Sequence, residues 1–258
     1  MKTLEARTGL LWIRDGFRLL RKRPFLLTNL FIAYFLLAML TGSLPVVGSV
    51  LPPWLAPTFS VLYLSAINEV HENRPFSFAR IFSVLTKPVI LRLLVLGGLY
   101  FLAAIIAVWI SSFVDGGIFM RAMGGEQIEM QVILESRFKA AFAVAALINF
   151  LALLFFWFVT PLIAWKNMPV GQSLFYNLFT LIRAWKAFIV YLAGLLLVAF
   201  LIPMLINSLV MIILGRHIGL LVTFSLLMVA AVLVYCSFYS MYIYMFGVPA
   251  TAAPAEQP

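Results

Sequence analysis

Charged residues are absent from five long stretches of the chain, and this pattern predicts membrane-spanning helices. The stretches cover residues 24–68, 93–114, 140–165, 187–215 and 217–255, and they run from 22 to 45 residues. A charge near the middle of a bilayer costs about 2.5–3.5 kcal/mol on insertion scales, and about 20 apolar residues cross the hydrocarbon. We therefore expect an all-α membrane protein whose helices are surrounded by lipid.

The first stretch, of 45 residues, is too long for one crossing. A continuous helix of this length would extend about 68 Å, roughly twice the hydrocarbon thickness. Helix breakers lie in its middle, at Gly42, Pro45, Gly48, Pro52 and Pro53. Two spans are therefore expected here and one in each other stretch. The resulting prediction is a six-helix transmembrane bundle in one domain, residues 1–247, with spans near 25–43, 54–70, 89–112, 140–165, 187–213 and 218–246.

Three segments outside the spans, near residues 4–22, 76–87 and 173–185, have the pattern of amphipathic helices. In each, apolar residues recur at i, i+3, i+4 and i+7 with basic residues off that face. The apolar positions are Ile13, Gly16, Phe17 and Leu20; Phe78, Ile81, Phe82 and Leu85; and Phe175, Leu178, Phe179 and Ile182. Such helices lie in the plane of the membrane surface. The order of one interfacial helix and two spans thus occurs three times, either as an internal repeat or as ordinary amphipathic helices between spans.

Basic residues predict the orientation of the chain. Its net charge is +9, although only 10% of the 258 residues are charged and 64% are hydrophobic. Of the 18 Lys and Arg residues, 14 lie in segments 1–23, 69–92 and 166–186, on one side of the predicted topology. The positive-inside rule makes this side cytoplasmic, with both termini inside. We expect contacts with anionic lipid head groups rather than nucleic acid. The candidates on the N-terminal helix are Arg14, Arg18, Arg21, Lys22 and Arg23.

Two further segments lie outside the predicted spans. Residues 113–139 predict an outer flap that holds Met120, Met123 and Met130. Thioether groups bind Cu(I), but methionine also fills apolar contacts, and both interpretations are open. Residues 248–258 are rich in Pro and Ala, which predicts a disordered tail.

Residues that could carry chemistry are few. Glu69, His71 and Glu72 belong to the densest polar cluster of the chain. This cluster is either a metal or acid–base site or the solvated end of a span where a loop begins. Pro203 and Asn207 indicate either a broken helix of the kind that binds transporter substrates or a plain kink. The sequence contains no P-loop, Rossmann fingerprint or nucleophile elbow. We expect no cofactor and no enzymatic activity.

The chain resembles an uncharacterised family of multi-pass inner-membrane proteins of proteobacteria. The resemblance rests on segments 12–17 and 23–24, the pair Pro45 and Gly48, and segments 55–57, 156–161 and 173–177. It implies a bacterial inner membrane and no particular activity. At residues 71–75 this chain has His-Glu-Asn-Arg-Pro where such proteins favour a basic Arg-Gly-Glu-like turn, so the resemblance implies nothing about this turn.

Two functions follow as expectations from the scarcity of intramembrane charge. The first is a non-enzymatic scaffold or accessory protein of the cell envelope, with a membrane protein or a second copy of the chain as its partner. The second is a transporter or lipid-handling protein for a neutral or lipidic cargo.

Overall fold

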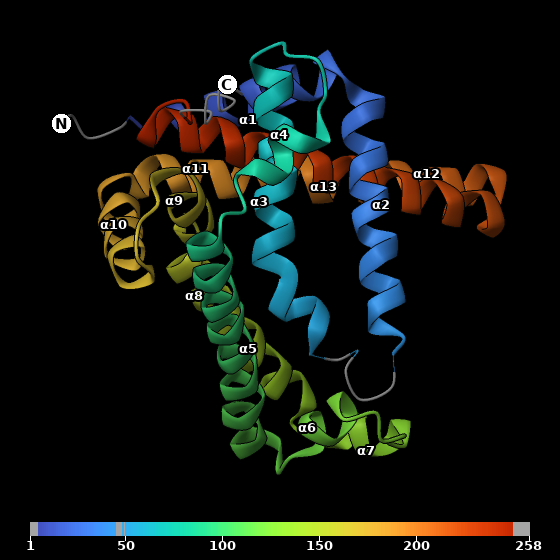
Figure 1. The fold of residues 1–258 in the computed structure, drawn as a ribbon. Helices are drawn as coiled ribbons and strands as arrows, with labels where there is room; N and C mark the ends of the chain where they lie inside the picture. The colour runs from blue at the N-terminus through green and yellow to red at the C-terminus, as the bar shows by residue number, and fades with distance from the viewer. Residues whose placement is uncertain (1–4, 45–47, 49, 250–258) are drawn as a thin grey trace.

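The computed structural model describes residues 5–44, 48 and 50–249, and every element in these residues is helical (Figure 1). The elements are α1 (Thr8–Lys22), α2 (Pro24–Gly42), α3 (Leu51–His71), α4 (Phe78–Ser83), α5 (Lys87–Asp115), α6 (Ile118–Met123), α7 (Met130–Glu135), α8 (Phe138–Phe156), α9 (Val159–Lys166), α10 (Val170–Arg183), α11 (Trp185–Leu196), the π-helical turn η1 (Leu197–Leu201), α12 (Ile202–Leu214) and α13 (Arg216–Phe246). Most of the predicted tail, residues 250–258, lies outside the described residues.

Helices long and apolar enough to cross a membrane occupy five places among the described residues. They are Pro24–Gly42, Lys87–Asp115, Phe138–Lys166, Trp185–Leu214 and Arg216–Phe246. The predicted span near 54–70 falls on α3, which is not among the five. Its three prolines and the polar residues Asn68 and Glu69 lower its hydropathy. Ten of its 21 residues are buried, because other helices rather than lipid surround its second half.

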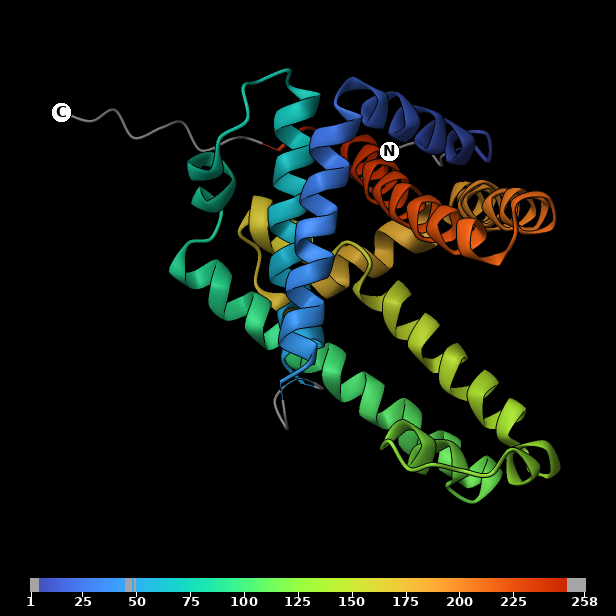
Figure 2. The ribbon, with the colours of Figure 1, turned by 90° about the vertical axis from the view of Figure 1, so that its right-hand side faces the viewer.

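The long helices form three antiparallel hairpins. The first consists of α2 and α3, the second of α5 with α8 and α9, and the third of α11, η1 and α12 with α13 (Figure 1). Their axes diverge: α12 and α13 run across α2 and α3, and α5 and α8 run obliquely away from both (Figures 1 and 2). The side that holds α1, α4 and the end of α13 is called the terminal face below. The sequence pattern predicts a bundle but carries no information on this divergence.

The three amphipathic helices pack in a cyclic order. α4 packs on α3 of the first hairpin, α10 packs on α5, α8 and α9 of the second, and α1 packs on α11 and α13 of the third. α4 and α10 thus each contact the hairpin that precedes them in the chain. α1, which has no preceding hairpin, contacts the last one, so the order of contacts is cyclic. The large buried clusters join α1, α2, α3 and α13, then α1, α9, α11 and α13, and then α3, α5, α8 and α9, so α1 is the amphipathic helix that contributes buried residues to them. The helices η1 and α12 contain no buried residue.

Each hairpin ends on a residue with a positive φ angle. Asn73, Asn167 and Gly247 follow α3, α9 and α13, and their φ angles are 55°, 52° and 82°. A positive φ departs from helical geometry: Asn167 has the αL conformation that commonly ends a helix, whereas Gly247 has an extended ψ of 171°. A proline shortly after such a residue prevents the helix from continuing. Each is followed two residues later by a proline, namely Pro75, Pro169 and Pro249.

The irregularity in the fifth predicted span is a π-helical turn. η1 ends at Leu201, two residues before Pro203, and α-helical structure resumes as α12. A π turn absorbs one extra residue without interrupting the helix. Asn207 has a buried Oδ1 atom with no hydrogen-bond partner in the described residues.

The predicted outer flap consists of α6, α7 and their connections. Asp115 fixes its start, because its carboxylate accepts hydrogen bonds from the backbone N–H of Gly117 at 3.0 Å and of Phe119 at 2.7 Å. The side chains of Met120, Met123 and Met130 are all exposed. The structure therefore places these three thioethers on a surface rather than in the core.

Candidate functional site

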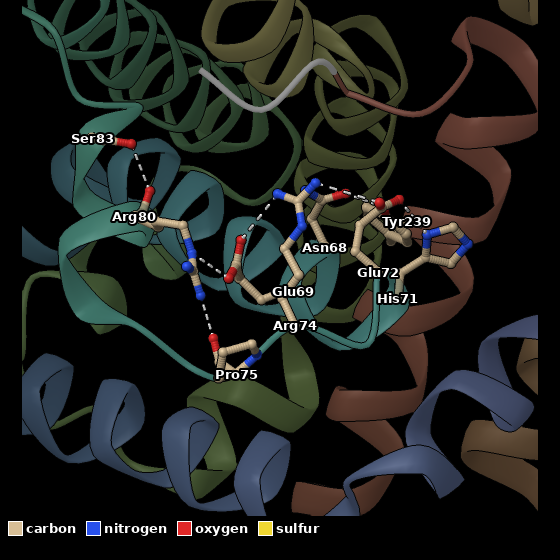
Figure 3. Close-up of polar contacts among 9 residues, drawn as sticks. All are labelled: Asn68, Glu69, His71, Glu72, Arg74, Pro75, Arg80, Ser83 and Tyr239. Atoms are coloured by element: carbon tan, nitrogen blue, oxygen red, sulfur yellow. Dashed lines mark hydrogen bonds and ion pairs between the residues drawn. The ribbon is translucent and has the colours of Figure 1, made fainter. Parts of the chain in front are cut away.

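A partly buried ion pair joins the end of α3 to α4 on the terminal face (Figure 3). Glu69 is only 3% exposed, and its Oε2 accepts a hydrogen bond from Arg80 Nε at 2.8 Å. Arg80 also donates to the carbonyl of Pro75, and Arg74 Nη1 lies 4.0 Å from the other oxygen of Glu69. The short helix α4 is therefore the element that brings a positive charge over the buried carboxylate.

The other members of the predicted polar cluster face a different direction. His71 lies against the ring of Tyr239, with ring centres 5.5 Å apart, and Glu72 pairs with Arg74 at 3.5 Å (Figure 3). The hydroxyl of Tyr239 donates to Asn68 Oδ1 at 2.5 Å. Glu69, His71 and Glu72 thus do not point at a common centre. Among the described residues, no group of three or more His, Cys, Asp or Glu side chains is placed to hold a metal ion.

A polar pocket of about 270 Å³ adjoins the Glu69–Arg80 pair. It lies between α3, α4, the start of α5 and the end of α9. Its lining residues are Ser65, Asn68, Glu69, Arg80, Ser83, Val84, Thr86, Val89, Ala164, Trp165, Asn167 and Pro249. Ser65 is 9% exposed, and its buried hydroxyl has no hydrogen-bond partner within the described part of the chain. The pocket therefore offers one positive charge, one negative charge and several uncharged polar groups against an apolar wall.

A second contact between distant segments fixes the wall of the pocket formed by α9. Arg92 Nη1 in α5 donates to Asn167 at two atoms, Oδ1 at 2.6 Å and the backbone carbonyl at 2.8 Å. Because Asn167 ends α9 in the left-handed region, this contact ties the end of α9 to α5. Sequence reasoning missed both Arg80 and Asn167 as site residues, since their partners lie 11 and 75 positions away.

The basic residues of α1 lie on the terminal face, and all five predicted lipid contacts are exposed. Arg14 and Arg18 each lie 3.3 Å from the carboxylate of Asp15. Lys22 donates to the carbonyl of His71 at 3.0 Å and to Asn73 Oδ1 at 3.1 Å. Lys22 therefore also ties α1 to the end of α3.

Helix α10 has its polar side inward. Ser173 and Asn177 are fully buried, whereas Phe175 and Phe179 are more than half exposed. This arrangement is the reverse of that in a soluble protein, and it fits a helix whose outer face contacts lipid. Asn177 contacts the junction between α8 and α9 and so positions the helix that lines the pocket.

We expect Arg80→Ala to lower the free energy of unfolding by about 1–3 kcal/mol. Breaking a fully buried ion pair costs about 3–5 kcal/mol, and the estimate is smaller here because Arg80 is partly exposed and Arg74 stands nearby. The matched control is Arg121→Ala, which breaks an exposed pair with Glu126 and should cost at most about 1 kcal/mol. Equal losses for both variants in unfolding of the detergent-solubilised protein would contradict the prediction.

The fold and its exposed apolar surfaces define a multi-pass helical membrane protein. The chain is 31% identical to a probable inner membrane protein of Burkholderia thailandensis, over 97% of this chain and 95% of that protein. It therefore belongs to the family of that inner membrane protein, which confirms the resemblance predicted from sequence. No protein-family model matches the chain, and no solved structure matches it. The chain is accordingly an inner-membrane protein with several membrane-spanning helices.

Proposed function

We propose that this protein is a non-enzymatic scaffold or accessory protein of the inner membrane. The observation that carries the proposal is the outward basic edge of α1, where Arg14, Arg18 and Arg21 stand exposed while the buried charges Glu69 and Asp115 are bound within the chain. Buried charges with partners of their own stabilise a fold, whereas exposed cations beside a membrane attract anionic groups.

The proposed topology has six spans with both termini in the cytoplasm. At about 1.5 Å per residue, the 21 residues of α3 extend about 32 Å, enough to return the chain across the hydrocarbon beside α2. The cyclic packing of α1, α4 and α10 and the residue of positive φ that ends each hairpin support three units of one interfacial helix and two spans.

Reporter fusions test this topology. A reporter that is active only in the cytoplasm should work when fused after Pro258, and a reporter active only outside should work when inserted after Gly125 in the flap. Activity of the second reporter at the C-terminus would refute the cytoplasmic assignment of the terminal face.

The predicted lipid contacts of α1 remain a proposal with its own test. Each arginine near an anionic surface contributes about 1 kcal/mol, so the triple variant Arg14→Gln, Arg18→Gln, Arg21→Gln should bind anionic lipid much more weakly. Native mass spectrometry of the full chain released from mixed-lipid nanodiscs measures the retained phosphatidylglycerol. Arg121→Gln in the flap is the control. Equal retention by the triple variant and the wild type would refute the contact.

The scaffold role predicts a protein partner on α1. A photoreactive residue at Leu10 or Phe17, which are about half exposed, should yield one discrete protein adduct in cells, and the same residue at the buried Phe31 should not. The adduct should weaken in the triple arginine variant. Adducts with lipid alone from both exposed positions would remove the support for a scaffold.

The second candidate function is lipid handling, and the polar pocket favours it. A cavity with charged and apolar walls at the ends of spans has the character of a head-group site. The pocket adjoins α4, whose Phe78 and Phe82 are exposed on the outer surface. Liposomes that contain the protein should then move labelled phospholipid between leaflets faster than protein-free liposomes, and equal rates would count against lipid handling.

A further inference from the structure

The polar pocket beside Glu69 contains a buried hydroxyl with no partner. Ser65 is 9% exposed, it lines the pocket, and its Oγ has no hydrogen bond in the described structure. A buried polar group without a partner costs free energy, and most such groups in native proteins are satisfied by protein, water or ligand. An unsatisfied hydroxyl on a residue that lines the pocket therefore indicates a polar occupant.

The charges on the pocket wall restrict the chemistry of this occupant. Glu69 and Arg80 both line the pocket and are 2.8 Å apart at their nearest atoms. An occupant with only one charge would be repelled by one member of the pair. A group that carries both an anion and a cation can place its anion by the guanidinium of Arg80 and its cation by the carboxylate of Glu69. Ser65 and Asn68 then provide uncharged hydrogen-bonding groups beside it.

The surroundings indicate that the occupant can be attached to a lipid. The pocket lies at the ends of α3, α5 and α9, where spans give way to the interfacial helix α4. Phe78 and Phe82 of α4 are 63% and 53% exposed, and aromatic residues of an interfacial helix enter the boundary between head groups and acyl chains. Val84, Val89 and Trp165 supply an apolar wall.

We propose that this pocket binds a zwitterionic phosphoethanolamine group, as a phosphatidylethanolamine head group or as soluble glycerophosphoethanolamine. The phosphate contacts Arg80, the ammonium contacts Glu69, and Ser65 donates a hydrogen bond to a phosphate oxygen. The volume of about 270 Å³ accommodates such a group without its acyl chains. The inference rests on the lipid-handling candidate, since it names the ligand of the same pocket.

The test is thermal unfolding of the detergent-solubilised full chain with three soluble probes: dihexanoyl-phosphatidylethanolamine, dihexanoyl-phosphatidylglycerol and glycerophosphoethanolamine. At a hundredfold excess over Kd, a ligand of the folded state should raise Tm by roughly 5–10 °C. We expect this rise with the first probe and not with phosphatidylglycerol. A rise with glycerophosphoethanolamine identifies a soluble source, and its absence identifies the lipid head group. Equal rises with both lipids, or no rise with any probe, overturn the proposal.

Two variants of Ser65 tie the effect to the pocket. Ser65→Leu fills the pocket and should abolish the shift, whereas Ser208→Leu, the same change on the exposed surface of α12, should keep it. Ser65→Ala leaves the space open and should raise Kd about five- to tenfold, because one hydrogen bond contributes about 1 kcal/mol. This second variant serves if Ser65→Leu fails to fold. An unchanged Kd for Ser65→Ala, or a retained shift for Ser65→Leu, overturns the proposal.

The outcomes also separate this inference from lipid handling itself. Binding of the phosphoethanolamine probe without faster lipid movement in liposomes leaves the pocket assignment intact and removes the transport role. Faster movement that is unchanged in Ser65→Leu keeps lipid handling and removes the pocket from it.

Discussion

Replacement of Asn177 by leucine should destabilise the protein by about 3–5 kcal/mol. The side chain is fully buried, and it bonds to three backbone groups where α8 gives way to α9. Its Oδ1 accepts from the N–H of Phe158 at 2.8 Å, and its Nδ2 donates to the carbonyls of Leu154 at 3.0 Å and Phe155 at 2.7 Å. Each buried group left without a partner costs about 1–3 kcal/mol, and hydrocarbon offers no substitute.

Asn149→Leu is the matched control for this prediction. Asn149 lies on the exposed surface of α8, and its side chain donates only to the carbonyl of Ala145 in its own helix, at 2.9 Å. Because an exposed face of a membrane-spanning helix favours apolar side chains, leucine should be tolerated or slightly stabilising there. Thermal unfolding in detergent should show a loss of about 10 °C for Asn177→Leu and little change for Asn149→Leu. A similar Tm for the two variants would show that Asn177 does not clamp the junction.

The role of Asn177 illustrates what the sequence could and could not predict. Segment 173–185 has apolar residues at helical spacing, and α10 lies there with Phe175 and Phe179 facing outward. The same pattern does not predict that Asn177 is buried, because a polar residue on an amphipathic helix normally faces water. Only the packing of α10 on α8 and α9 shows that the Asn177 side chain forms hydrogen bonds with backbone groups of another helix.

The spans were the most predictable part of the fold, and the site was the least. Long stretches without charged residues locate the membrane-spanning helices, because a charge in hydrocarbon has a large free-energy cost. This cost depends on the residues of the stretch itself and not on distant contacts. Five of the predicted spans coincide with helices able to cross a membrane. In the sequence, Arg80 is only a basic residue beside the apolar face of an amphipathic helix. Its contact with Glu69 depends on how the six-residue α4 packs against α3.

Close packing between α3 and α5 should make Gly97→Ala strongly destabilising. A Cβ atom at Gly97 would collide with the backbone carbonyl of Trp54, an atom that cannot rotate away. The two helices approach closely enough there for Trp54 Nε1 to donate to the carbonyl of Leu94 at 2.8 Å. Small residues permit such contacts between membrane helices, and an added methyl group must separate them. Overpacking costs about 1–3 kcal/mol, and the lost hydrogen bond adds about 1 kcal/mol.

The adjacent Gly98 is the control for this prediction, because alanine there should not lower stability. A Cβ at Gly98 would lie 3.8 Å from the ring of Trp54, which is ordinary contact, so Gly98→Ala meets no obstacle. Alanine favours a helix over glycine by about 1 kcal/mol, and this gain applies at both positions. Gly98→Ala should therefore be neutral or stabilising, and Gly97→Ala should still lose about 1–3 kcal/mol after the gain. Thermal unfolding of both variants in detergent measures the difference. If the two glycines tolerate alanine equally, α3 and α5 do not touch at Gly97, and the first two hairpins do not meet along this seam.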